Sequence, residues 1–276
     1  IQGGMTPIAA GIGLANKIKN KKAVAVAYIG DGTLGEGIFY ETLNLASLWK
    51  IPIIFVLEIN GIAQTTNNKQ SISGSVKGRA KAFGVRHLSS TTDNVKELFN
   101  TCKSAINEAR KNEEPILLEI KTNRLNSHSK GDDNRDPNFV NSLKIIDPIN
   151  QLEKLDPVLF NSIVEKSDLL ISSVLSKVEL SETLTKYKIK VDERTNKDIN
   201  WKDYNNNTNI RGNDSIYDSL KNEMKSNDNV ILLGEDIESS NDFNPGEYGG
   251  AFKVTKDLSI LFKDRVKNTP ISEQAI

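Results

Sequence analysis

The sequence has a single cysteine, Cys102, and its 36 lysines and arginines are balanced by 36 aspartates and glutamates. One cysteine excludes an internal disulfide framework and fits a reducing compartment, so we expect a cytoplasmic protein. A balanced charge disfavours nucleic acid as a partner. No apolar run approaches the roughly 20 residues that a membrane span needs, so we expect no membrane partner either.

The chain also lacks an initiator methionine and a charged-then-apolar leader at its start, "IQGGMTP", and it ends on the apolar "NTPISEQAI". We therefore expect a fragment that is truncated at both ends. Its 276 residues are enough for two domains.

Residues 1–125 alternate strand and helix patterns. The apolar runs 23–29, 52–58 and 115–122 predict strands of a parallel sheet, the first of them covered on both faces. Apolar residues at helical spacing lie between these runs and before the first, where Thr6 is the expected N-cap and Pro7 the first helical residue. Strands separated by helices predict an α/β fold with a doubly wound parallel sheet.

The rest of the chain differs in composition. Helical patterns continue to about residue 182, and an Asn-, Lys- and Asp-rich segment, 183–213, then predicts a linker. Residues 214–276 restart an α/β pattern. In it we expect a helix over 215–225, a strand over 229–236, and a helix over the sequence "GGAFKVTKDLSILFK". The sequence therefore predicts two domains, 1–182 and 214–276, joined by the linker.

An acid stands between two glycines where the first strand ends, in "YIGDGTLGEG". If the first two strands are neighbours, Asp31 and Asn60 face the same crevice, because ligands bind at the carboxyl ends of parallel strands. The glycines let the backbone approach a ligand, and a following helix N-terminus favours an anion. A hard cation such as Mg²⁺ would reconcile the aspartate with that anion. Taken alone, the tripeptide is more often a tight turn with a capping aspartate.

The spacing resembles the thiamine diphosphate signature, which is Gly-Asp-Gly, about two dozen residues, and a pair of asparagines. The segment "EGIFYETLNLASLWKIPIIFVLE" is similar to the alpha subunit of the first, decarboxylating component of 2-oxoacid dehydrogenase complexes. This resemblance implies the thiamine-diphosphate-binding fold. It implies that Asp31, the side chain of Asn60 and the carbonyl of Ile62 hold Mg²⁺, and that Gly30 and Gly32 contact the cofactor. The first asparagine of the usual pair is Ile59 here.

Two other segments resemble the same family. "GGMTPIAAGIGLANK" resembles the segment beside the aminopyrimidine and places Gly3 near the cofactor. "TNRLNSHSKGDD" resembles the active-site loop, which implies functional roles for Arg124, His128, Ser129, Asp132 and Asp133. His128 would approach the diphosphate and the substrate carboxylate, although a loop histidine is often simply solvated. The family's Tyr-Arg pair is missing after this loop, and Arg135 is the nearest substitute. Nothing in the sequence indicates whether Ser129 is phosphorylated.

The third zone resembles the start of the beta subunit of the same enzyme, through "LLGED", "YGGAFKVTK" and "TPISE". The chain is therefore expected to be an alpha–beta fusion. The resemblance implies that Glu273 is the acid that hydrogen-bonds the pyrimidine ring and that Glu235 is a second active-site carboxylate. The structural alternatives are an acid in the first turn of a helix for Glu273 and a loop acid for Glu235.

The activity implied by the resemblance is thiamine-diphosphate-dependent oxidative decarboxylation of a 2-oxoacid. The acyl group would pass to a lipoyl group on a partner acyltransferase. The full-length fused chain is expected to be a homodimer and the fragment alone to be inactive. The sequence leaves open whether the substrate is pyruvate, a branched-chain 2-oxoacid or acetoin. The alternatives are a transketolase-like transferase and a non-catalytic module that binds a nucleotide or diphosphate.

Overall fold

The computed structural model describes residues 3–63, 66–128, 135–181, 210–238, 249–250, 252–270, 272 and 274–276. The chain divides into two compact units, residues 1–150 with 213–276 and residues 151–212. Residues 182–209, which contain most of the predicted linker, lie outside the described residues. The predicted domain boundaries therefore stay a prediction.

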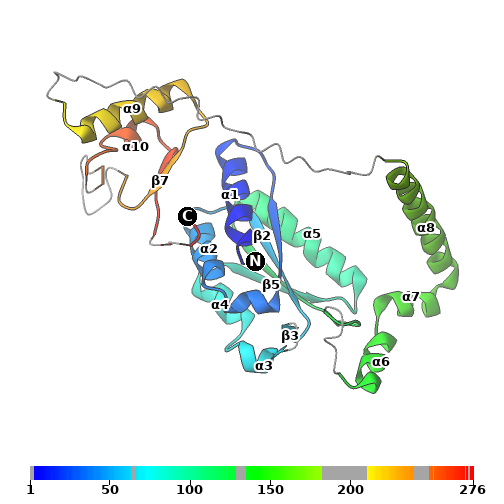
Figure 1. The fold of residues 1–276 in the computed structure, drawn as a ribbon. Helices are drawn as coiled ribbons and strands as arrows, with labels where there is room; N and C mark the ends of the chain where they lie inside the picture. Colours follow the sequence, from blue (N-terminus) through cyan, green and yellow to red (C-terminus); the bar gives the residue numbers. More distant parts are fainter. Residues whose placement is uncertain are drawn as a thin grey trace. The chain divides into compact units, whose positions relative to one another are not determined.

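A four-stranded parallel sheet, in the order β1-β2-β6-β5, forms the centre of the first part of the chain (Figure 1). Its strands are β1 (Ala25–Gly30), β2 (Ile53–Ile59), β5 (Arg86–Thr91) and β6 (Ile116–Lys121). The three strands predicted from apolar runs are confirmed as β1, β2 and β6. The sequence did not predict β5, because its residues "RHLSST" are mostly polar, as suits the last strand in the described order.

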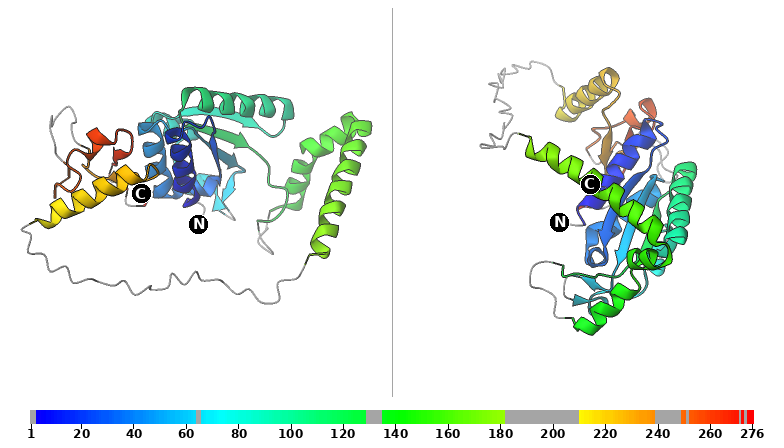
Figure 2. Two further views of the ribbon diagram at one scale, coloured as in Figure 1. Left: turned by 90° about the horizontal axis from the view of Figure 1, so that it is seen from above. Right: turned by 90° about the vertical axis from the view of Figure 1, so that its right-hand side faces the viewer.

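Helices cover both faces of this sheet, as the doubly wound pattern predicts. On one face, α1 (Met5–Ile18), α2 (Gly37–Leu48) and α4 (Val76–Ala82) pack with β1 and β2 around Phe39, Leu43 and Phe55. On the other face, α5 (Val95–Asn112) buries Ala105 and Ala109 against residues of β2 and β6. Figure 2 shows α1 and α5 on opposite sides of the strands.

The α5 side of β1 is not covered by the described residues. Val26 and Tyr28 are 44% and 63% exposed there, whereas Ala25, Ala27 and Ile29 are buried on the opposite face. The prediction that this strand is covered on both faces is therefore wrong for the described part of the chain. The reason is geometric: β1 stands at one end of the strand order, and α5 packs against β5, β6 and β2.

The start of α1 also differs from the prediction. The helix begins at Met5, so Thr6 lies inside it and is fully buried rather than being its N-cap. The Thr6 hydroxyl donates to the carbonyl of Gly3 at 2.7 Å and lies 3.2 Å from the hydroxyl of Thr42 in α2. Thr42 also donates to the Ile38 carbonyl at 2.7 Å. This buried polar contact joins the first turn of α1 to the second turn of α2.

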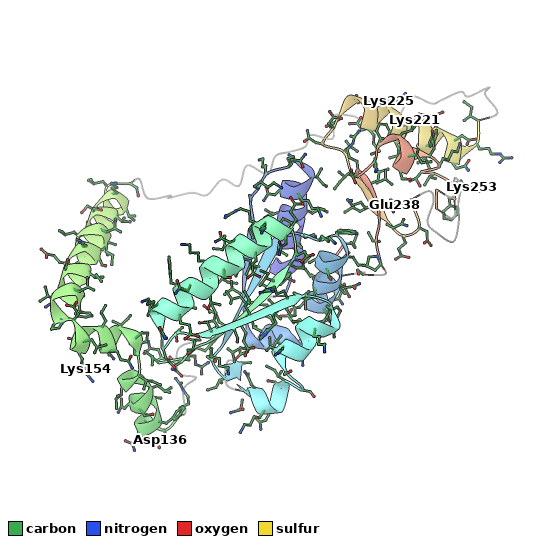
Figure 3. All side chains as sticks on the ribbon, turned by 180° about the vertical axis from the view of Figure 1, so that it is seen from behind. Asp136, Lys154, Lys221, Lys225, Glu238 and Lys253 are labelled. Atoms are coloured by element: carbon green, nitrogen blue, oxygen red, sulfur yellow. The ribbon has the colours of Figure 1, made fainter. Side chains whose placement is uncertain are left out.

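Three helices follow the sheet: α6 (Pro137–Ile145), α7 (Pro148–Leu155) and α8 (Pro157–Glu179). Asp136, labelled in Figure 3, caps α6 by accepting from the backbone N–H of Asn138, and Asp156 caps α8 in the same way through Leu159. Each capping aspartate precedes a proline, which favours the first helical turn. Among the described helices, none combines the length and the apolar composition that a membrane crossing requires.

The last part of the chain has its own small core. Helix α9 (Gly212–Ser226), the parallel strands β7 (Leu232–Gly234) and β8 (Val266–Asn268), and the short helix α10 (Leu258–Leu261) bury Tyr217, Met224, Leu258 and Val266. The predicted helix and strand at 215–236 are confirmed. The helix expected over 249–263 is wrong: residues 252–257 form turns and bends, because several residues have positive φ, namely Gly249, Gly250, Lys253 and Lys256.

Candidate functional site

The loops that follow β1, β2 and β6 leave the sheet at one edge. Because β1, β2 and β6 are parallel neighbours in register, their carboxyl ends meet, with Gly30 opposite Glu58 and Ile59 opposite Lys121. The condition set for the first two predicted strands, that they are neighbours, is therefore met. A 3-10 helix, η1 (Asp31–Gly35), follows β1 directly, and the next loop begins at Asn60.

Asp31 is the buried acid of this edge, with only 3% of its surface exposed. Its Oδ2 atom accepts three hydrogen bonds: from the backbone N–H of Asn60 at 3.3 Å, from that of Gly61 at 3.1 Å, and from Nδ2 of Asn68 at 2.8 Å. Among the described residues, none donates to Oδ1 and no cationic side chain forms an ion pair with this carboxylate. A buried charge is unfavourable unless it is compensated, so the free oxygen points to a cationic ligand.

The loop after β2 folds back to reach Asp31. Gly61 has φ +85°, a conformation that favours glycine, and Oδ1 of Asn60 accepts from the N–H of Ile62 at 3.0 Å. The antiparallel strands β3 (Ile62–Ala63) and β4 (Thr66–Asn67) then reverse the chain into the short helix α3 (Asn68–Ser71). The N–H of Asn68 donates to the Gly61 carbonyl at 3.0 Å, which closes this loop. Asn68 was not predicted, because its position depends on the β3–β4 pairing.

Two of the predicted glycines lie close to neighbouring side chains. A Cβ atom at Gly32 would lie 3.3 Å from Cβ of Ala63, and a Cβ at Gly3 would lie 2.3 Å from Oε2 of Glu36. The N–H of Gly3 donates to both carboxylate oxygens of Glu36, at 3.1 and 3.2 Å. Glu36 precedes α2, so Gly3 is held beside the loop that follows β1. Glu36 was not predicted from the sequence.

Arg79 of α4 fixes the far end of η1, and the sequence analysis missed it as well. Its guanidinium donates to the carbonyl of Leu34 at 3.1 Å and to that of Ser73 at 2.5 Å, and it lies 5.4 Å from the ring centre of Tyr40. The Tyr40 hydroxyl also donates to Leu34. These contacts connect α2, α4 and η1 and hold the backbone around Asp31.

The predicted active-site loop follows β6 at the same edge of the sheet. Arg124 is half-buried, and His128 is exposed. The guanidinium of Arg135 donates to the carbonyl of Arg124 at 2.6 Å and to that of Asn126 at 3.2 Å. Arg135 therefore contacts the backbone of this loop. From the sequence, we expected it to substitute for a phosphate-binding arginine. The other predicted residues of this loop, Ser129, Asp132 and Asp133, lie outside the described residues.

The predicted sites of the last part of the chain are only partly described. Glu235 is exposed in the turn after β7, beside Asp236 with its φ of +56°. Glu273 lies outside the described residues. Its neighbour Ser272 is 4% exposed.

The donor set around Asp31 fits a hard cation. Within the described residues no group of three or more His, Cys, Asp or Glu side chains is placed to hold a metal ion. The oxygens predicted as ligands are the Asp31 carboxylate, the Asn60 amide and the Ile62 carbonyl, which are the ligand types that Mg²⁺ prefers. A further amide oxygen, Oδ1 of Asn68, is buried without a hydrogen-bond partner.

Known proteins resemble this chain in sequence and in fold. An alpha subunit of the pyruvate dehydrogenase E1 component from Zymomonas mobilis is 35% identical over 56% of the chain and 45% of its own length. The alpha subunit of acetoin:2,6-dichlorophenolindophenol oxidoreductase from Bacillus subtilis is also 35% identical, over 48% of the chain and 40% of its own length. A transketolase structure from Campylobacter jejuni matches with a TM-score of 0.52 at 21% identity, over 99% of this chain and 43% of that one.

The chain thus spans about half the length of the curated relatives that it matches. The transketolase likeness bears on the fold alone, and it agrees with the expected α/β fold with a parallel sheet. The family model of the dehydrogenase E1 component matches residues 1–197. The chain belongs to the dehydrogenase E1 component family.

Proposed function

We propose that the loops at the carboxyl edge of the sheet bind Mg²⁺ together with the diphosphate of thiamine diphosphate. One observation carries the proposal: Asp31 is buried, its Oδ2 is occupied by three N–H donors, and no cation of the described chain compensates it. Asp31, Asn60 and the carbonyl of Ile62 supply the protein ligands. Gly30 and Gly32 keep the backbone close enough for the diphosphate to approach.

Other residues complete the proposed site around this centre. Gly3 lies beside the cofactor, and Arg124 and His128 of the loop after β6 bind the phosphate and the substrate carboxylate. A guanidinium donates charge-assisted hydrogen bonds to such anionic groups, and an imidazole N–H can donate to them as well. We further propose that residues 214–276 are the start of a fused beta-type domain. It contributes Glu273 as the acid that hydrogen-bonds the pyrimidine ring and Glu235 as a second carboxylate.

The reaction we propose is oxidative decarboxylation of a 2-oxoacid, with transfer of the acyl group to a lipoyl group of a partner acyltransferase. The relative named for pyruvate supports this class of substrate, whereas the relative named for acetoin points to a hydroxyketone, which has no carboxylate to lose. When bound, thiamine diphosphate supplies the electron sink for loss of carbon dioxide. The chain's residues bind and orient the cofactor, and Glu273 holds a proton at the pyrimidine nitrogen. We propose that the complete protein is the catalyst, a homodimer of the fused chain, and that residues 1–276 alone are inactive.

Two measurements on the full-length protein test this function. Calorimetric titration with thiamine diphosphate is run with Mg²⁺ and again with a chelator, and we expect binding only when the cation is present. Carbon dioxide release is then measured for pyruvate and a branched-chain 2-oxoacid, and acetaldehyde release for acetoin, each with and without a lipoylated acceptor. Equal cofactor affinity in the chelator would remove the metal site from the proposal.

A transketolase-like transferase is the second candidate, and the fold likeness to a transketolase favours considering it. It shares the cofactor and the cation site but would transfer a ketose fragment between sugars. Ketose transfer without decarboxylation of any 2-oxoacid would select this candidate. A protein that binds neither thiamine diphosphate nor Mg²⁺ would instead be a non-catalytic module.

A further inference from the structure

The side chain of Asn68 has one end fixed and the other end unsatisfied. Its Nδ2 donates to Oδ2 of Asp31 at 2.8 Å. A carboxylate can only accept hydrogen bonds when ionised, so the amide nitrogen must face Asp31 and the amide oxygen must face away. That oxygen, Oδ1, is buried and has no hydrogen-bond partner. A buried acceptor without a donor is unfavourable, so a group that the protein chain does not supply is expected to meet it.

Hydrogen bonds of the loop fix the position of Asn68. Its backbone N–H donates to Gly61, whose own N–H donates to Asp31. Gly61 therefore holds both the carboxylate and the residue that contacts it. The neighbouring Asn67 is exposed, and among the described residues its side chain accepts only from the N–H of Lys69, as the cap of α3. Of these two adjacent asparagines, only Asn68 faces the acid.

We propose that Asn68 is a positioning residue of the cation site: its Nδ2 holds Asp31, and its Oδ1 accepts a hydrogen bond from a water molecule of the cation's coordination shell. Mg²⁺ usually keeps some of its waters in proteins, and such waters need acceptors because the cation strengthens them as donors. A carboxylate ligand is in turn oriented by the groups that hydrogen-bond its second oxygen. Asn68 therefore fixes which oxygen of Asp31 is offered to the cation. The inference rests on the cation site proposed above.

The test is cation binding in the full-length protein, with Mn²⁺ as the paramagnetic probe for Mg²⁺ and thiamine diphosphate present. Binding is measured by electron paramagnetic resonance for the wild type, Asn68→Leu, Asn68→Ala and the control Asn67→Leu. We expect the dissociation constant for Mn²⁺ to rise about 10- to 100-fold in both Asn68 variants, as for other residues that orient metal ligands. The control should bind Mn²⁺ like the wild type, although it loses the cap of α3.

Thermal unfolding without cation or cofactor separates positioning from a purely structural role. Asn68→Leu removes one hydrogen bond and also one unsatisfied oxygen, so we expect its unfolding temperature to stay near the wild-type value. Wild-type Mn²⁺ affinity in both Asn68 variants would overturn the inference while leaving the cation site standing. Absence of Mn²⁺ binding by the wild type, or unchanged binding by Asp31→Asn, would overturn the proposed function and this inference together.

Discussion

Replacing Asp31 with asparagine separates two tasks of its carboxylate, which are to accept hydrogen bonds from the next loop and to bind a cation. Asparagine has the same shape but no charge, and its amide oxygen must take the place of Oδ2, because three N–H groups point there. The amide nitrogen then occupies the position of Oδ1. A cation would meet N–H donors in place of a carboxylate oxygen and would not bind.

The expected effect on the unliganded protein is small, because two terms oppose each other. Hydrogen bonds to a charged group contribute about 1.5–3 kcal/mol and ordinary ones about 0.5–1.5 kcal/mol, so weakening three of them costs roughly 3–4 kcal/mol. Removing a charge from a site that is 3% exposed recovers several kcal/mol of desolvation. We therefore expect an unfolding temperature within about 4 °C of the wild type, the shift that roughly 1 kcal/mol produces.

The liganded protein should differ much more. A ligand present at a hundred times its dissociation constant stabilises the native state by about 2.7 kcal/mol. At about 2–4 °C per kcal/mol, the wild type gains roughly 5–11 °C from Mg²⁺ and thiamine diphosphate. Asp31→Asn should gain nothing.

Differential scanning calorimetry with and without the two ligands measures both effects, and Asp93→Asn is the matched control. Asp93 is an exposed acid just after β5, at the same edge of the sheet, so its variant should keep the full ligand-induced shift. A full shift in Asp31→Asn would refute the cation argument. A loss of several kcal/mol in the unliganded variant would instead identify Asp31 as a structural turn acceptor.

Three further changes test the surroundings of the site. Gly32→Ala should destabilise the protein by up to about 1 kcal/mol in urea unfolding, because its Cβ would lie in tight contact, 3.3 Å, with that of Ala63, and Ala63→Gly in the same chain should relieve this contact. Arg79→Lys should weaken both stability and cofactor binding, because lysine cannot donate to two carbonyls and lie flat over an aromatic ring at once; equal behaviour would show that charge alone suffices. Burial raises the pKa of the Cys102 thiol, so iodoacetamide should alkylate it only at higher pH than a free cysteine, until unfolding removes the difference.

The sheet and its chemistry could be predicted because they depend on local pattern. Continuous apolar runs identified β1, β2 and β6, and the rule that ligands meet the carboxyl ends of parallel strands brought Asp31 and Asn60 together. Strand β5 was not predicted because its sequence is mostly polar and contains no apolar run. The predicted helix over 249–263 failed for a related reason: apolar spacing does not reveal a backbone that turns through left-handed residues such as Lys253 and Lys256.

The residues that support Asp31 could not be predicted from pattern at all. Asn68 reaches the acid only because Gly61 turns the chain and β3 pairs with β4. Arg79 reaches η1 from α4, far along the sequence, and nothing in the spacing connects the two. Glu36 lies in a glycine-rich stretch, and no sequence pattern distinguishes it from other acids. Only the structure shows that it accepts a hydrogen bond from the N–H of Gly3.

The two interpretations of the Gly-Asp-Gly tripeptide, a capped turn and a cation site, prove to be compatible. Oδ2 of Asp31 performs the structural task, since it accepts the N–H groups of Asn60 and Gly61 that shape the next loop. Among the described residues no donor contacts Oδ1, so this oxygen can bind a ligand. The donors that contact Oδ2 fix the direction in which Oδ1 points. A turn that only needed capping would be served equally well by asparagine or serine, which carry no buried charge. Asp31 is charged although it is only 3% exposed, and this buried charge is the reason to expect a cation beside the turn.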